Sequence, residues 1–159
     1  MTTAIHRKSL LFASLQYNPE REMLDIIPEI LQDMTHYRVE CTRSGENAIE
    51  SAQKGCNTVI LLDTIVDVGR DAKLSVYFAF PQDYRPGLWT LDMIKEHAPT
   101  QRVIVMSHDF PGLEDSCMFA GAEAYFRIPF SPLTIVDHLV EKDPSMAKAS
   151  RYAAERRYG

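Results

Sequence analysis

The stretch Thr58–Asp63 reads TVILLD, and it decides both the fold and the candidate site. A short run of β-branched and aliphatic residues is typical of a strand that is buried on both faces of a parallel sheet. The run ends in a single carboxylate, Asp63. Ligands of open α/β sheets bind at the carboxyl ends of the strands. The stretch therefore predicts a central strand that ends at a binding edge.

Similar short apolar runs occur on both sides of this stretch and predict four more strands. They are Ser9–Ala13, Tyr37–Thr42, Arg102–Ser107 and Glu123–Arg127. Between the runs, apolar residues recur every three or four positions, which is typical of amphipathic helices. Strands that alternate with helices five times predict βαβ units, and therefore a parallel sheet with helices on both faces.

Turn and capping residues set the expected limits of the helices. One helix is expected from Asn18-Pro19 to Met34, with Pro28 kinking or dividing it. The others are expected over Glu46–Lys54, from Gly87 to before Pro99, over Gly112–Ala120 and over Ser131–Val140. Ser44-Gly45 is expected as a turn. Residues 146–158 are rich in alanine and are expected to form a further helix.

Composition indicates one globular domain with an acidic body. The 159 residues are 45% hydrophobic and 25% charged, which is ordinary for a soluble protein. The net charge is −5, although the last thirteen residues carry four basic side chains against one glutamate. An acidic body does not indicate a nucleic-acid binder. No apolar run approaches the roughly 20 residues of a membrane span, so neither nucleic acid nor membrane is an expected partner.

The three cysteines, Cys41, Cys56 and Cys117, lie far apart in the sequence. They form no C-x-x-C pair, so they indicate neither a zinc site nor a disulfide framework. We interpret them as reduced thiols of a cytoplasmic protein. The amino-terminal residues contain no apolar stretch of the kind found in signal peptides, which agrees with that location.

Several short motifs, in this order and spacing, resemble the receiver domain of two-component response regulators, the CheY-like family. The matching pieces are Ser44-Gly45-Glu46-x-Ala48, Val59–Asp63, Val103–Ser107, Ala120-Gly121-Ala122-x-Ala124-Tyr125 and Pro129-Phe130-Ser131. The resemblance implies a three-layer, flavodoxin-like (βα)5 fold with the parallel strand order 2-1-3-4-5. The receiver-like domain would span residues 1–146, with an insertion at 64–86 after the third strand. Residues 147–159 would add a basic, helical C-terminal tail.

The resemblance also implies roles for three residues. In the family, the aspartate that ends the third strand accepts a phosphoryl group, and Asp63 holds that position. A hydroxyl at the end of the fourth strand contacts the phosphate, and Ser107 matches it. An aromatic residue on the fifth strand responds by turning inward, and Tyr125 matches it.

Two features of the family are missing from this sequence. The acidic pair that holds Mg²⁺ after the first strand is replaced by Ser14 and Leu15, and the lysine before the fifth-strand proline is replaced by Ile128. Mg²⁺ is a hard cation that binds through carboxylates, waters and phosphate oxygens. Phosphoryl transfer depends on neutralising negative charge. We therefore expect a degenerate, stand-alone receiver that acts by protein–protein interaction, largely without phosphorylation.

Two alternatives remain open. Asp67, Asp71 or Asp83 could supply a rebuilt metal site, in which case Asp63 would be phosphorylated and Mg²⁺ would be the cofactor. The edge that has lost its charges could instead bind a small signalling molecule. No cofactor is expected otherwise. No motif of an enzyme active site is present, so no catalytic residue is predicted.

The most unusual segment is the second apolar run, Leu74–Phe80, which lies within the insertion. It is either a flap that packs on the domain or an apolar edge that binds a protein partner, including a second copy of the chain. Aromatic residues are natural anchors of such interfaces. The candidates are Tyr77, Phe78, Phe80, Tyr84 and, on the fifth strand, Phe126.

Overall fold

A computed structural model describes residues 8–14, 26–62, 86–108, 112–128 and 132–148. Five strands form one parallel sheet in the order β2-β1-β3-β4-β5. Their bounds are Ser9–Ser14 for β1, Arg38–Thr42 for β2, Thr58–Leu62 for β3, Arg102–His108 for β4 and Ala124–Ile128 for β5. The expected flavodoxin-like fold and its strand order are confirmed. Strand limits differ from the predicted ones by one residue at several ends.

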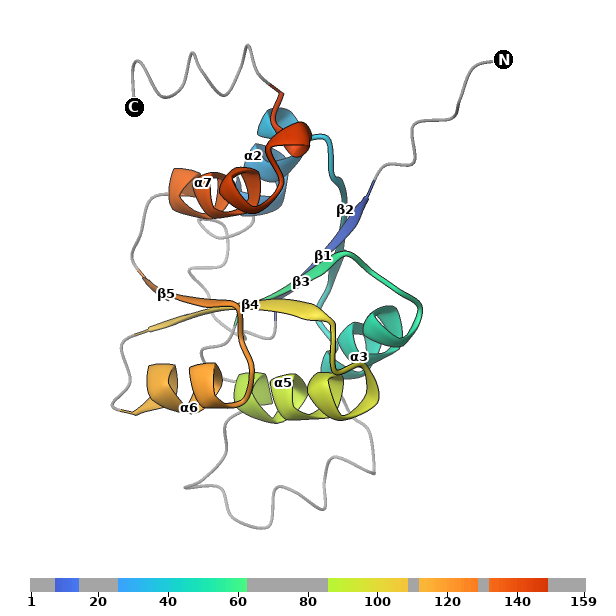
Figure 1. Ribbon diagram of the computed structural model, residues 1–159, viewed down its shortest axis with the longest axis vertical. Coiled ribbons are helices and arrows are strands. Elements are labelled where there is room, and N and C mark those ends of the chain that lie inside the picture. The colour runs from blue at the N-terminus through green and yellow to red at the C-terminus, as the bar shows by residue number, and fades with distance from the viewer. Residues whose placement is uncertain (1–7, 15–25, 63–85, 109–111, 129–131, 149–159) are drawn as a thin grey trace.

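Helices cover both faces of the sheet (Figure 1). They are α2 (Ile26–Met34), α3 (Gly45–Gln53), α5 (Pro86–His97), α6 (Leu113–Phe119) and α7 (Pro132–Lys142), and a 3-10 turn, η3 (Pro144–Met146), follows α7. Helices α2 and α7 lie on one face, and α3, α5 and α6 lie on the other. The three layers match the expected architecture.

Each face of the sheet has its own apolar core because side chains of a strand alternate between faces. On β1, Leu10 and Phe12 pack with α2 and α7. The residues between and after them, Leu11 and Ala13, pack with α3 and α5. The central strand β3 is completely buried from Thr58 to Leu61, as its continuous apolar sequence predicted.

The start of α3 differs from the prediction. Ser44-Gly45 was expected as a turn, but Ser44 is the N-cap of α3 and Gly45 is its first residue. The Ser44 hydroxyl oxygen accepts a hydrogen bond from the Asn47 backbone N–H, which would otherwise lack a partner at the helix start. At the other end, Gly55 has a φ of 87°, the left-handed conformation that favours glycine after a helix.

The position of Pro28 was expected to kink or divide a helix that begins near Asn18. In the structure, Pro28 is the third residue of α2. Residues in the first turn donate no hydrogen bond within a helix, so proline removes none there. Residues 15–25 lie outside the described part of the chain, and so does the expected helix start.

The chain after α7 does not continue as the helix that was expected from Met146. Ala147 instead forms an isolated antiparallel bridge with Thr35. Two backbone hydrogen bonds flank this bridge, from His36 N to Met146 O (2.7 Å) and from Lys148 N to Met34 O (3.0 Å). These bonds to the end of α2 use backbone groups that a helix would need. Residues 149–159 of the predicted tail lie outside the described residues.

Candidate functional site

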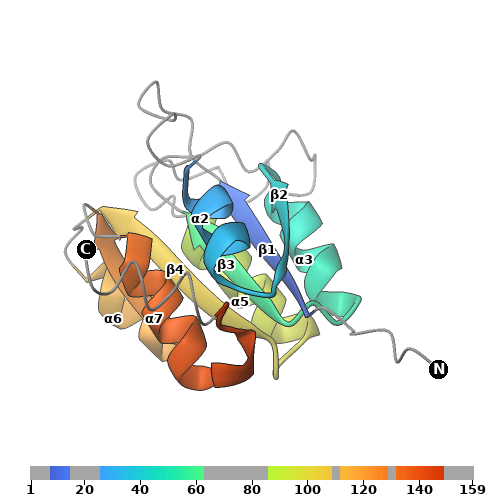
Figure 2. The ribbon, with the colours of Figure 1, turned by 90° about the horizontal axis from the view of Figure 1, so that it is seen from above.

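The candidate site is the edge where the parallel strands end (Figure 2). Ser14, the last residue of β1, pairs with Leu62, the last residue of β3, and Leu62 pairs with Met106 on β4. Asp63 follows Leu62 in the sequence, and Ser107 follows Met106. The strand register therefore brings the chain positions just before Asp63 and Ser107 together.

Ser107 is buried, with 3% of its surface exposed. On β4, Val103 and Val105 belong to the core beneath α3, α5 and α6. Strand alternation places Ser107 on the same face. Tyr125 pairs with Val105 across β4 and β5 and packs against that same core. The two residues that the resemblance assigned to switching thus lie on one face of neighbouring strands.

Arg127 is the basic residue next to the position of the missing lysine. Its guanidinium Nη2 lies 2.7 Å from Glu114 Oε2 on α6. Both side chains are exposed, so the ion pair contributes little to stability. The contact nevertheless shows that Arg127 reaches α6 on the outer surface of the domain.

Several predicted site residues cannot be placed at this edge. Asp63, Leu15 and the possible metal ligands Asp67, Asp71 and Asp83 lie outside the described residues, and so do Tyr77, Phe78, Phe80 and Tyr84. Of Ser14 and Ile128 the structure describes the strand position only. The roles of these residues therefore remain predictions. Phe126 is described, and it is half-buried.

The ring of Phe126 makes an edge-to-face contact with His138 of α7, with 5.8 Å between centroids and an interplanar angle of 78°. Such aromatic contacts prefer this geometry. Phe126 also packs against the core beneath α2 and α7. At least part of this side chain therefore serves the interior of the domain.

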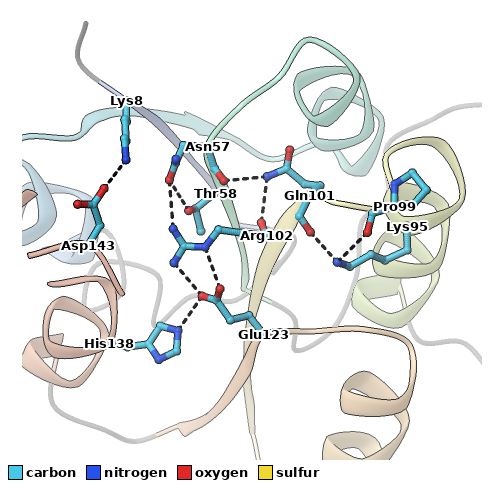
Figure 3. A network of polar contacts seen from close by, with 10 residues as sticks. All are labelled: Lys8, Asn57, Thr58, Lys95, Pro99, Gln101, Arg102, Glu123, His138 and Asp143. Carbon is cyan, nitrogen blue, oxygen red and sulfur yellow. Dashed lines mark hydrogen bonds and ion pairs between the residues drawn. The ribbon is translucent and has the colours of Figure 1, made fainter. Parts of the chain in front are cut away.

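The sequence did not predict a polar network at the opposite, amino edge of the sheet (Figure 3). Arg102 donates from Nε to Glu123 Oε1 (2.8 Å) and from Nη2 to Glu123 Oε2 (3.0 Å). His138 Nε2 lies 2.7 Å from the same Oε2. Paired and parallel N–H···O contacts of this kind are among the stronger protein hydrogen bonds. They connect the starts of β4 and β5 to α7.

The electrostatics of Glu123 reflect this environment. Burial by itself would raise the pKa of the Glu123 carboxyl, but the hydrogen bonds from Arg102 and His138 outweigh burial and lower the pKa to about 2. The hydrogen bond with Glu123 raises the pKa of Arg102 in turn. Arg102 and Glu123 are therefore both ionised at neutral pH. Together with His138 they form a latch, a hydrogen-bonded connection between the sheet and α7.

The network extends across the edge of the sheet through three more residues. Arg102 Nη1 donates to Asn57 Oδ1 at 3.4 Å, at the start of β3. Gln101 donates from Nε2 to the Asn57 carbonyl (3.2 Å), and Lys95 of α5 donates to the Gln101 carbonyl (2.6 Å). Because the network joins three strands to helices on both faces, its role is structural. The sequence did contain a signal for this network, since Arg102 begins one predicted strand and Glu123 begins the next.

One apolar feature of the described surface was also missed. Phe119, at the end of α6, is 95% exposed, and its neighbour Met118 is 44% exposed. Exposed apolar residues that occur singly are normal, but two large ones side by side suit a contact surface. They belong to the same helix as Glu114, the partner of Arg127.

Within the described ranges, no three His, Cys, Asp or Glu side chains gather closely enough to hold a metal ion. The acidic residues that follow β3 are not among those ranges. None of the helices in the described part of the chain combines the length and the apolar character needed to cross a membrane.

The strand order, the three layers and the placement of Ser107 and Tyr125 define the class of fold, which is that of the CheY-like receiver domains. No protein-family model matches the chain, and no curated protein matches its sequence. Solved receiver structures do match it. The chain therefore has the receiver fold, at 15–20% sequence identity to the similar solved structures.

Three of the similar structures show the extent of the likeness. The BeF3-activated receiver domain of DrrB, a Thermotoga maritima protein, is 20% identical and covers 85% of this chain and 96% of its own, with a TM-score of 0.61. A CheY-like receiver domain protein from Methanospirillum hungatei JF-1 is 18% identical, covers 86% and 93%, and has a TM-score of 0.60. A protein named as pilus assembly-related, from Burkholderia pseudomallei, is 15% identical, covers 92% and 98%, and has a TM-score of 0.60.

Proposed function

We propose that this chain is an atypical receiver module of a two-component-type signalling system, which acts by binding a protein partner and not by Mg²⁺-dependent phosphorylation of Asp63. The observation that carries the proposal is the combination of a receiver fold with Ser14, Leu15 and Ile128 at the positions of the acidic pair and the lysine. The solved neighbours support the signalling context, because they are named as response-regulator receivers.

The charge balance supports the loss of phosphorylation. A phosphoryl group that approaches Asp63 brings negative charge to a carboxylate, and catalysis depends on cations that offset the repulsion. A serine and a leucine supply no charge for Mg²⁺, and an isoleucine supplies none for the phosphate. The guanidinium of Arg127, the nearest basic group in the sequence, is paired with Glu114.

The partner surface that we propose has two parts. The first is the apolar segment Leu74–Phe80 of the insertion, with Tyr84 close behind it in sequence. The second is the end of α6, where Met118 and Phe119 are exposed. Exposed apolar and aromatic residues of this kind suit a protein partner, either another signalling protein or a second copy of the chain. We propose a cytoplasmic location because the three cysteines show no pattern of a disulfide framework.

Phosphorylation can be tested with a small phosphoryl donor. The chain is incubated with acetyl phosphate and Mg²⁺, and its intact mass is measured over time. A receiver that keeps the acidic pair and the lysine serves as the positive control. We expect the control to gain a phosphoryl group and this chain to remain unmodified. A stoichiometric mass gain that requires Mg²⁺ and is abolished in Asp63→Asn would instead establish the alternative, a receiver with a rebuilt metal site.

A further inference from the structure

Strand β2 is an outer strand of the sheet (Figure 1). Among the residues that the structure describes, it pairs with β1 only. An outer strand directs one row of backbone N–H and C=O groups away from the sheet, and such a row can pair with a strand of another chain. Neither the receiver resemblance nor the proposed function uses this edge, so its properties can be judged independently of Asp63.

The backbone hydrogen bonds of β2 show which of its residues face outward. The Arg38 N–H donates to the Lys8 carbonyl at 2.9 Å, next to β1. Successive residues of a strand direct their backbone groups to opposite sides, so those of Val39 point away from β1. The Val39 carbonyl accepts a hydrogen bond from the exposed Gln32 side chain at 3.4 Å, which is longer than the usual distance of about 2.9–3.0 Å. A backbone N–H of a second strand would replace this long contact with a shorter one.

The side chains of β2 place two opposite charges on one face and an apolar residue on the other. Val39 is buried in the core beneath α2 and α7. Strand alternation therefore puts Arg38 and Glu40 on the opposite face, where both side chains are exposed and lie 3.4 Å apart. An exposed ion pair contributes little to the stability of the fold, so these two charges can be exchanged for charges of a partner at little cost.

The sequence Arg38-Val39-Glu40 is complementary to itself when two copies run antiparallel. If Val39 lies opposite the Val39 of a second copy, each Arg38 lies opposite a Glu40. The two valines then exchange two backbone hydrogen bonds, and the charged residues occupy the flanking pairs, in which side chains lie closest. Opposite charges directly across from each other stabilise a pair of strands.

The same charges disfavour the neighbouring registers. A shift of one strand by two residues keeps the outward-facing backbone groups opposite each other. In one direction the shift places Arg38 opposite Arg38, and in the other it places Glu40 opposite Glu40. Like charges directly across from each other are destabilising. The charges on β2 therefore select the register that is centred on Val39.

We propose that two copies of this chain associate through their β2 edges, in an antiparallel and two-fold symmetric pair centred on Val39. A two-fold interface requires a surface that is complementary to itself, and the charge pattern of Arg38 and Glu40 meets that requirement. The sheets of the two copies join into one continuous sheet. Helix α6 lies at the other end of the sheet, beside β5 (Figure 1), so this interface leaves the exposed end of α6 accessible.

Sedimentation equilibrium of the full chain tests the proposal with variants of reversed charge. Arg38→Glu and Glu40→Arg each place like charges opposite each other twice in the proposed register. The matched controls are Lys54→Glu and Glu50→Arg, which reverse charges of the exposed ion pair at α3. Far-UV circular dichroism checks that each variant is folded, as expected from the exposure of the Arg38 and Glu40 side chains.

We expect the parent to form a dimer whose dissociation constant rises about tenfold or more in each β2 variant and is unchanged in each control. An equimolar mixture of Arg38→Glu and Glu40→Arg should recover the dimer, because one chain then carries two acidic side chains on this edge and the other carries two basic ones. If one β2 variant fails to fold, the other is compared with its control.

Three results would overturn the proposal. The first is a parent that stays monomeric. The second is a β2 variant that associates as the parent does, or a control that is weakened as much. The third is a mixture of the two β2 variants that associates no better than either variant alone.

Discussion

At the scale of single residues, Glu123 is the most informative side chain of the described structure. Its carboxylate accepts hydrogen bonds from Arg102 and lies against His138, and its pKa is lowered to about 2. A carboxyl whose pKa is lower in the folded state stabilises the fold above its unfolded pKa of about 4.5. That contribution is lost as the pH falls from about 4.5 toward 2.

Replacing this carboxylate should therefore change stability and its pH dependence together. We expect Glu123→Gln to cost about 1–3 kcal/mol of unfolding free energy at neutral pH, because Arg102 would keep a partly buried charge without its anionic partner. The loss of stability between pH 4.5 and 2 should also become shallower. Urea unfolding across this pH range measures both effects.

The exposed glutamate Glu50, which pairs with Lys54 at 2.8 Å on α3, provides the control. Glu50→Gln should leave both the stability at neutral pH and the acid profile close to those of the parent, since exposed pairs contribute little. If Glu123→Gln and Glu50→Gln behave alike, the latch between β5 and α7 does not stabilise the fold.

A second residue-scale prediction concerns the close approach of α3 and α5. A Cβ atom added at Gly45 would lie 2.7 Å from Thr90 Oγ1, and Thr90 is completely buried. We expect Gly45→Ala to destabilise the protein by about 1–3 kcal/mol through overpacking, although alanine is the better helix former. Chemical denaturation measures the change.

The double variant Gly45→Ala with Thr90→Ala tests the cause. The Thr90 hydroxyl has no hydrogen-bond partner in the described part of the chain, so its removal makes room without breaking a bond. The double variant should be more stable than the sum of the two single changes predicts. Purely additive changes would show that the contact is relieved by rotation of Thr90.

At the scale of elements, the sequence predicted strands well because their signal is local. The β-branched runs around Val59 and Val103 could only be buried strands, and both are. Pattern and turn residues also placed α5 and α6 to within a residue or two. What could not be predicted depends on contacts between distant parts of the chain. Ala147 leaves helical geometry because Thr35, more than a hundred residues earlier, offers a bridge.

The polar and exposed residues described above were also predicted only in part. The pairing of β4 with β5 places Ser107 and Tyr125 on one face, and their switching roles remain predictions. The latch of Arg102, Glu123 and His138 was missed because periodicity does not show which charged residues meet. The exposed end of α6 was missed because an amphipathic pattern does not reveal that Phe119 faces outward.

A large apolar residue can serve the core or the surface, and a comparison of Phe12 on β1 with Phe119 on α6 separates these two roles. Phe119 on α6 is 95% exposed, whereas Phe12 on β1 is 2% exposed. We expect Phe119→Ala to leave the thermal midpoint unchanged and Phe12→Ala to cost about 3–5 kcal/mol. If the end of α6 also joins two copies of the chain, sedimentation equilibrium should show weaker self-association in Phe119→Ala.

A thermal midpoint that falls as much for Phe119→Ala as for Phe12→Ala would contradict the assignment of Phe119 as an exposed side chain at the end of α6. A parent protein that stays monomeric at high concentration would exclude the homodimer. The partner would then have to be a different protein.

At the scale of the whole molecule, the two edges of the sheet have different characters. The amino edge is fastened by the polar network from Lys95 to His138. The carboxyl edge includes Ser14 and Ile128, at positions where the receiver resemblance implies an acidic residue and a lysine. The proposed function predicts that this edge supports contacts with a partner and does not carry out phosphoryl chemistry.

Restoring the missing charged residues tests whether their absence prevents phosphorylation of Asp63. The variant Ser14→Asp with Leu15→Asp and Ile128→Lys returns the acidic pair and the lysine to their positions in the strand framework. Asp63→Asn is the control for the site itself. Beryllofluoride mimics a phosphoryl group on an aspartate, and fluorine NMR distinguishes its bound form from its free form.

The most direct measurement is therefore the fluorine NMR spectrum of the unmodified chain with beryllofluoride and Mg²⁺. We expect free beryllofluoride signals only in the parent, and a bound signal in the restored variant because metal and lysine can again offset the charge on Asp63. A bound signal in the unmodified chain that requires Mg²⁺ and disappears in Asp63→Asn would contradict the account.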